Sequence, residues 1–412
     1  MIHPAADPPG RWLQLGVLAT GILLAFAPWF SAAAVAPSLA VEWGTSGLDI
    51  PLLTVAVQLG FAAAALAMAA SGATDVVSGR SLFFAGSILG GVANLGFAIV
   101  PEDAGAALPF RALTGAALAL VYPVGMRMIA GWFRSGRGLA IGVLIGALTV
   151  GSALPHLFRA AGVAAGADWR PVVVAASVVA VIGGLLVLAL ARSGPFETSA
   201  PRFSLSTAAA AFRDPAVRLA NLGYLGHMWE LYAMWTWIPL FIAASFAASG
   251  SGDPAVAALA AFAIVAVGGI GCVGAGLLAD RLGRTTLTMA AMAVSGTSAL
   301  LIGFLFGAPP LVLFALALVW GVTVVADSAQ FSAAVSELSP PGTAGSALQM
   351  QVASGFVLTS VTILGVGLLD PIDATGWRIA FGSLAIGPAV GTFAMWRLRR
   401  RPEALRMAGG RR

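Results

Sequence analysis

Twelve apolar stretches, each long enough to cross a lipid bilayer, follow one another along this chain of 412 residues. A bilayer core requires about 20 predominantly apolar residues per helix. With 59% hydrophobic and 9% charged residues, the chain lies far outside the composition of soluble domains. We therefore predict an all-α membrane protein. The spans are expected near residues 12–36, 50–71, 81–100, 106–130, 138–161, 171–192, 218–246, 255–279, 285–307, 311–335, 343–369 and 377–396.

Two polar breaks between these stretches are near copies of each other, at an offset of about 205 residues. Residues 72–80 read Gly-Ala-Thr-Asp-Val-Val-Ser-Gly-Arg, and residues 276–284 read Gly-Leu-Leu-Ala-Asp-Arg-Leu-Gly-Arg. A Trp-Arg pair that opens an apolar stretch also recurs, at Trp169 and Trp377. Internal repeats of this kind are typical of transporters whose two halves move about a central binding site.

The repeat divides the chain into two halves of six spans. We expect an N-terminal six-helix bundle over residues 1–192, a cytoplasmic linker over 193–217, a C-terminal six-helix bundle over 218–396 and an Arg-rich cytoplasmic tail over 397–412. The linker and the tail are basic enough to contact anionic membrane lipids, or to act only as topological anchors. Glycines 142 and 146 predict close helix packing.

The arginines indicate the orientation in the membrane. With both termini in the cytoplasm, eleven arginines from Arg11 to Arg284 and seven from Arg397 onward lie at inside breaks. Only Arg159, Arg170 and Arg378 lie at outside breaks. Because cytoplasmic loops carry the excess of basic residues, we predict a multi-pass protein of the inner (plasma) membrane with both termini cytoplasmic.

Several function classes are excluded or disfavoured. All 22 basic residues are Arg, so a Walker A lysine is impossible and ATP-driven transport by this chain alone is disfavoured. No metal-ligand cluster, cofactor motif or nucleophile motif is present, which disfavours an enzyme. The pI near 10.5 does not indicate nucleic-acid binding, since the arginines stand at the ends of apolar stretches. We expect a monomer without a cofactor.

The second polar break, Gly276 to Arg284, resembles the signature turn of the major facilitator superfamily, and the segment from Arg111 to Ala117 resembles a weaker motif of its fourth helix. The resemblance implies two pseudo-symmetric six-helix bundles around a central cavity, alternating access, and a latch role for both turns. The first copy departs from the pattern, since no Arg follows its Asp. The gating residues implied are Asp75, Arg80, Asp280, Arg281, Gly283 and Arg284.

Charged groups inside spans are costly and therefore indicate function. Glu230 is expected near the bilayer midplane in the seventh span, with His227 on the same helical face and Tyr224 one turn earlier. We interpret His227 and Glu230 as a proton site that faces the cavity. The alternative is a buried Glu230 that only ties helices together through hydrogen bonds.

Further polar groups are candidates for substrate or proton binding. Asp327 in the tenth span, beside Gln330, either binds the coupling ion or substrate, or pairs with a neighbouring helix. Gln58 in the second span is a candidate lining group. Arg111 either neutralises an anionic substrate, since guanidinium groups match oxyanion geometry, or stabilises the outer end of its helix.

These observations favour a proton-coupled secondary transporter that moves a small polar or anionic organic solute by alternating access. A proton-antiport exporter of hydrophobic drugs or metabolites is the first alternative. It is weakened because the fifth span, from Gly142 to Gly151, lacks the Gly-Pro pair typical of such exporters in the family. A non-transporting sensor or scaffold with a transporter fold is the second alternative.

Overall fold

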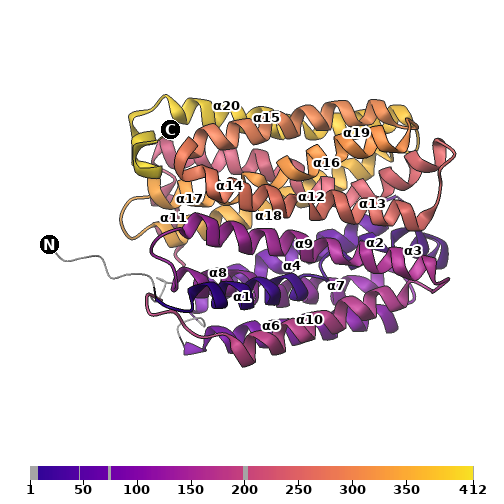
Figure 1. The fold of residues 1–412 in the computed structure, drawn as a ribbon, viewed down its shortest axis with the longest axis horizontal. Coiled ribbons are helices and arrows are strands. Elements are labelled where there is room, and N and C mark those ends of the chain that lie inside the picture. The colour runs from indigo at the N-terminus through magenta and orange to yellow at the C-terminus, as the bar shows by residue number, and fades with distance from the viewer. Residues whose placement is uncertain (1–7, 46, 73–75, 198–202, 412) are drawn as a thin grey trace.

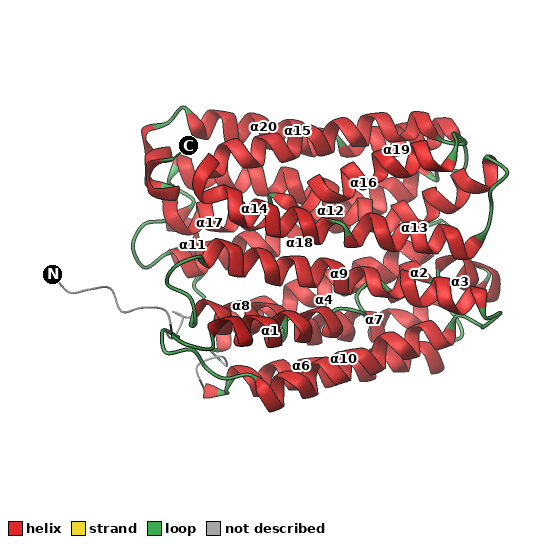
Figure 2. Cartoon of the chain, in the orientation of Figure 1, coloured by secondary structure: helices red, strands yellow, loops and turns green. Residues whose placement is uncertain are grey.

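The structure, a computed structural model, describes residues 8–45, 47–72, 76–197 and 203–411. In Figure 1 the two halves of the chain lie side by side, with the indigo and magenta helices below the orange and yellow ones. Figure 2 shows that helices running lengthwise make up nearly all of the drawn molecule. Within the described residues, eleven helices are long and apolar enough to cross a membrane, and Arg11–Ala25 is a shorter apolar helix.

The helices of the first half form the six expected spans, several of them in two pieces. They are α1 (Arg11–Ala25), α2 (Ser31–Ala34), α3 (Ala36–Trp43), α4 (Asp49–Ser71), α6 (Gly79–Ile99), α7 (Ala104–Leu118), α8 (Tyr122–Ala130), α9 (Arg137–Ala164) and α10 (Arg170–Leu190).

The linker helix and the second half follow the same plan. They comprise α11 (Leu205–Ala211), α12 (Pro215–Ala248), α13 (Pro254–Ala266), α14 (Gly268–Leu282), α15 (Arg284–Ile302), η1 (Gly303–Leu305), α16 (Pro310–Ala326), α17 (Ser328–Leu338), α18 (Ala344–Leu369), α19 (Ala374–Leu384), α20 (Ile386–Arg399), η2 (Pro402–Arg406) and η3 (Ala408–Gly410).

Breaks inside the spans are a feature that the sequence prediction of continuous apolar stretches missed. The first span breaks between Ala25 and Ser31, and the tenth breaks at Asp327. Pro28 lies in the first break and supplies no backbone N–H to an uninterrupted helix. At the first break a charged side chain bonds backbone carbonyl oxygens, and at the second a charged side chain pairs with a histidine, as described below.

The two halves meet along two seams. In the first, α9 packs on α13 and α14, and a Cβ added to Gly142 would stand 2.6 Å from the Cys272 carbonyl oxygen. A Cβ on Gly146 would stand 3.0 Å from the Gly269 carbonyl oxygen. The predicted close packing is therefore confirmed, and it joins one half to the other. In the second seam α4 packs on α18.

The linker and the C-terminal tail gather at one end of the bundle, on the left in Figure 1, which we call the linker end. The opposite end is the far end. The tail folds onto the second half: Met407 is fully buried, Arg406 lies 3.2 Å from Asp214, and the Ala408 N–H donates to Glu337. The Arg411 guanidinium also bonds the Asp280 carbonyl oxygen.

At the far end, the first half is fastened by Glu42. Its carboxylate accepts hydrogen bonds from Arg170 and from the Trp169 indole, both at 2.6 Å. These bonds, the one from Arg170 foremost, lower the pKa of Glu42. The repeated Trp-Arg pair thus ties α10 to α3 in the first half.

Candidate functional site

A cavity of about 510 Å³ lies between the two halves, within the range of small-molecule sites. Its deepest lining residues, Trp29 and Trp235, are each 1% exposed. Its lining reaches exposed side chains at the linker end, Arg137 and Ser336. The cavity is therefore open toward the linker end and closed toward the far end.

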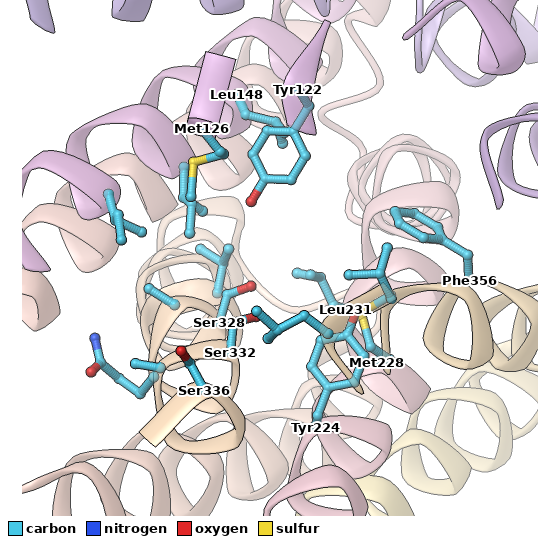
Figure 3. Close-up of a pocket in the computed structure, with 18 of the residues that line it drawn as sticks. Tyr122, Met126, Leu148, Tyr224, Met228, Leu231, Ser328, Ser332, Ser336 and Phe356 are labelled. Carbon is cyan, nitrogen blue, oxygen red and sulfur yellow. The ribbon is translucent and has the colours of Figure 1, made fainter. Parts of the chain in front are cut away.

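Figure 3 shows side chains from both halves pointing into this space. The first half contributes the Tyr122 hydroxyl, and α12 of the second half contributes Tyr224 from the opposite side. Much of the remaining wall is apolar, so the cavity has both apolar faces and faces that carry hydroxyl groups. Labelled apolar members are Met126, Leu148, Met228, Leu231 and Phe356.

Three serines on α17 form a polar stripe along one wall. Ser328, Ser332 and Ser336 are spaced four residues apart, which places them on one face of the helix, and all three line the cavity. Ser332 donates a 3.4 Å hydrogen bond to Gln351. Our sequence interpretation did not identify this stripe, although serines at helical spacing in an apolar stretch are a usable signal.

The cavity mouth holds charged residues that are already partnered. Arg284 donates to Glu337 at 2.6 and 3.1 Å and to Gln330 at 2.7 Å. Arg137 donates to the carbonyl oxygens of Phe133 and Ala130. Glu337 therefore neutralises Arg284, whereas Arg137 has N–H groups occupied by carbonyl oxygens and keeps its positive charge at the mouth.

The second latch turn leads directly into this mouth. Gly283 has a φ of 86° between α14 and α15, which favours glycine. The Asp280 side chain is 59% exposed and lies 3.6 Å from Arg284, and Arg281 is exposed. In the first copy of the turn, Arg80 is exposed at the start of α6, and Asp75 lies outside the described residues.

Six aromatic side chains close the far end of the cavity, and we call them the aromatic plug: Trp29, Phe30, Phe61, Tyr232, Trp235 and Phe356. The first three belong to one half and the last three to the other. Rings meet across the halves, with centroids 4.7 Å apart for Phe61 and Phe356 and 5.9 Å for Trp29 and Tyr232. Because the plug joins the halves, it must part when the far end opens.

His227 is paired with Asp327 and not with Glu230. Its Nδ1 lies 2.9 Å from Asp327 Oδ1, and both side chains are 1% exposed. Within the described residues, His227 Nε2 has no hydrogen-bond partner. The pair stands at the break between α16 and α17, one residue from Ser328 of the cavity wall. The expected His227–Glu230 site facing the cavity is therefore corrected, because neither residue lines the cavity.

Glu230 points into the second half, away from the cavity. Its two carboxylate oxygens accept hydrogen bonds from the Trp320 indole at 2.7 Å and from the Ser295 hydroxyl at 2.9 Å. Both oxygens are thus occupied. This geometry matches the alternative that the sequence left open, in which Glu230 ties α12 to α15 and α16.

Arg111 fastens the break in the first span. It is fully buried and donates to the carbonyl oxygens of Pro28 and Trp29 at 3.1 and 2.6 Å. It also donates to Ser31 and to Asn94. The guanidinium does not line the cavity, so it is not placed to neutralise an anionic substrate. Instead it satisfies backbone oxygens that the helix break exposes, and it holds Trp29 in the plug.

The remaining predicted residues divide into lining and buried groups. Tyr224 and Gln330 line the cavity. Gln58 is fully buried on α4, is not part of the lining, and has no hydrogen-bond partner for either amide atom among the described residues. Within those residues there is no cluster of groups able to hold a metal ion.

The model of the Major Facilitator Superfamily matches residues 18–366. The chain belongs to the major facilitator superfamily. It is accordingly a multi-pass membrane carrier and not an enzyme. The crystal structure of a D-xylose-proton symporter superposes with a TM-score of 0.72 at 17% identity, covering 95% of this chain and 98% of that one. No curated protein sequence matches the chain.

Proposed function

We propose that this superfamily member carries a small, uncharged, hydroxyl-bearing organic solute by alternating access, driven by protons. The observation that carries the proposal is the distribution of polar groups in the cavity. Hydroxyls of Tyr122, Tyr224 and the α17 serine stripe line its walls, while its charged side chains stand at the mouth and are partnered.

The cations that line the cavity, Arg137 and Arg284, stand at its mouth and already donate hydrogen bonds, which argues against an anionic solute bound in its interior. Burying an unpaired charge costs several kcal/mol, and Arg111, the cation that would have offset an anion, is enclosed behind the wall with four hydrogen bonds. Hydroxyl groups, by contrast, exchange hydrogen bonds with serine and tyrosine at little cost. An uncharged polar solute therefore fits this cavity better than a charged one.

The pair of His227 and Asp327 is the proposed proton site. Both groups are buried and lie within ion-pair distance, and His227 Nε2 has no hydrogen-bond partner among the described residues. Ser328 and Gln330, one and three residues after Asp327 on α17, line the cavity, so the pair lies close behind its wall. Gain or loss of a proton there changes the net charge at the α16–α17 break, which is a physical means of coupling protonation to movement of α17.

We assign the linker end to the cytoplasm, with the protein in the inner (plasma) membrane. The asymmetry of the arginines supports this orientation. The cavity then opens to the cytoplasm in this conformation, and the plug closes it on the outside.

Matched pairs of solutes that differ in charge test the proposal. Thermal stability of the purified protein is measured with D-xylose and its acid D-xylonate, and with D-glucose and its acids D-gluconate and D-glucuronate, since a ligand of the native state stabilises it by mass action. The polyol myo-inositol is added as a further uncharged solute. We expect stabilisation by at least one uncharged member and none by its acid. Stabilisation by the acids alone would overturn the uncharged assignment.

Export of hydrophobic compounds is the second candidate, favoured by the thioethers of Met126 and Met228 and by the aromatic floor. Such soft, adaptable side chains suit varied apolar ligands. Stabilisation by hydrophobic cations such as tetraphenylphosphonium, without any response to the uncharged polyols, would select this candidate. Solute flux in proteoliposomes separates both candidates from a non-transporting sensor.

A further inference from the structure

Two indole N–H groups in the aromatic plug are buried without an acceptor. Trp29 Nε1 and Trp235 Nε1 have no hydrogen-bond partner among the described residues, and each side chain is 1% exposed. The two rings flank Tyr232, with centroids 5.9 and 5.5 Å from the tyrosine ring. Buried indoles normally find a partner, so two orphaned donors in one cluster require an explanation.

Other buried indoles of the chain show that partners are ordinarily supplied. Trp237, two residues after Trp235 on α12, donates to the Ile363 carbonyl oxygen at 3.1 Å. Trp320 donates to Glu230, and Trp132 donates to the Arg192 carbonyl oxygen. Outside the plug, Trp377 Nε1 is also unpartnered. In the plug, two unpartnered indole N–H groups, one from each half, therefore lie on rings that contact the same tyrosine.

Gln58 adds further unsatisfied polarity on the adjoining helix. It precedes the plug residue Phe61 by three positions on α4, which puts the two on one helical face. Its amide nitrogen and oxygen both lack partners among the described residues, and its side chain is fully buried. An amide both donates and accepts, as an uncharged hydroxyl-bearing solute requires.

We propose that the Trp29 and Trp235 indole N–H groups, with the Gln58 amide, form an entry subsite for acceptor oxygens of an uncharged solute when the far end is open. This inference rests on the proposed function for its solute. With the plug closed, the donors have no partner among the described residues. Once the plug parts, water or solute oxygens accept from them, and the flat aromatic faces remain available for the apolar side of the solute.

The orphaned donors then also set the balance between the two states. Each unpaired buried donor disfavours the closed plug by at least about fivefold in the equilibrium. Replacing the indole by phenyl keeps an aromatic ring but removes the donor, so the closed plug gains stability relative to the open one. The variants Trp29→Phe and Trp235→Phe are therefore expected to hold the far end shut.

The first experiment reads the plug without any solute. In a Cys272→Ser background, Ala34→Cys places a thiol on α2, one turn beyond Phe30 toward the far end. Its labelling rate by a bulky hydrophilic maleimide is measured in nanodiscs. We expect each Trp→Phe change to slow labelling about fivefold and the double variant to slow it more. Trp237→Phe is the matched control and leaves the rate within about twofold.

An unchanged or faster rate in the double variant, or an equal decrease in the Trp237→Phe control, would overturn the proposal. Thermal melting accompanies each variant, so that a folding defect is recognised separately. Because this assay contains no solute, it tests the plug even where the polyol assignment fails.

The second experiment uses the uncharged polyol that stabilises the wild-type protein in the matched-pair screen. Its apparent affinity is measured from each side in sealed vesicles of known orientation. We expect Trp29→Phe/Trp235→Phe to weaken binding from the far side about tenfold or more. Linker-side binding should weaken less, because the two rings line the cavity in that state but their N–H groups are buried. Equal weakening from both sides would contradict a subsite confined to the far-open state.

Discussion

The fourth and tenth spans occupy equivalent places in the two halves, and each buries one charged side chain, with opposite results. Arg111 in α7 makes four hydrogen bonds, and only its Nε lacks a partner among the described residues. Asp327, between α16 and α17, has His227 Nδ1 at 2.9 Å, and the Nε2 of that histidine has no hydrogen-bond partner among the described residues. Arg111, with its four hydrogen bonds, thus fixes a helix break, while Asp327 is the group that we propose exchanges a proton together with His227.

Removing Arg111 is expected to have the largest effect. Arg111→Met removes four buried hydrogen bonds and leaves the Trp29 carbonyl oxygen without the guanidinium that bonds it, which costs about 1–3 kcal/mol for each polar group left unpaired. We expect a large fall in the melting temperature of the purified protein, with or without solute. The exposed Arg378→Met is the control and costs less than about 1 kcal/mol. An Arg111→Met protein that is stable but has lost solute binding would contradict the structural role of Arg111 and would show that it acts on the solute.

Neutralising Asp327 should spare stability and abolish coupling. Asp327→Asn keeps the shape of the side chain but removes the charge opposite His227. We expect proton-driven accumulation in proteoliposomes to fall at least about tenfold, a loss of about 1.4 kcal/mol of coupling, while exchange of solute without a proton gradient continues. Full accumulation by the variant would place the proton site elsewhere.

Glu230→Gln tests the same contrast within one half of the molecule. Both Glu230 oxygens are bonded, so the amide disturbs one of the two bonds and costs about 1–3 kcal/mol of stability. Proton coupling should persist, unlike in Asp327→Asn. Loss of coupling in Glu230→Gln with normal melting would show that a carboxylate with both oxygens hydrogen-bonded still carries the proton. The distinction between Glu230 and the His227–Asp327 pair would then fail.

The smallest effect is expected at the latch. Asp280 is more than half exposed and lies 3.6 Å from Arg284, so Asp280→Asn should change stability by less than about 1 kcal/mol. We expect slower turnover, a few-fold in exchange assays, with equilibrium solute affinity within about twofold. Glu102→Gln, at an exposed position of the far end, is the control. A large loss of affinity with normal turnover would place Asp280 in the binding site.

Periodicity and charge predicted the fold well because the bilayer imposes helix length directly. The expected seventh span, 218–246, differs by only a few residues from Pro215–Ala248. The breaks in the first and tenth spans escaped prediction, since they depend on side chains from distant helices. Arg111, 80 or more positions from the residues of the first break that it bonds, is the clearest case.

The candidate site was harder to predict, because spacing along one helix does not reveal the partner across the bundle. His227 and Glu230 share a helical face, which suggested a joint site, yet His227 meets Asp327 and Glu230 meets Trp320. Gln330 and Tyr224 do line the cavity, as their depth suggested. The aromatic plug required both halves in place, since its ring contacts join residues more than 200 positions apart.

Proton movement that depends on an uncharged solute is the decisive measurement for the proposed transport cycle. Proteoliposomes loaded with a pH-sensitive dye receive D-xylose, D-glucose or myo-inositol without an imposed gradient. Separate samples receive D-xylonate, D-gluconate, D-glucuronate or the hydrophobic cation tetraphenylphosphonium. We expect at least one uncharged solute to move protons in wild type and in Glu230→Gln but not in Asp327→Asn. Proton movement with the acids or hydrophobic cations alone, or undiminished movement in Asp327→Asn, would contradict the proposed cycle.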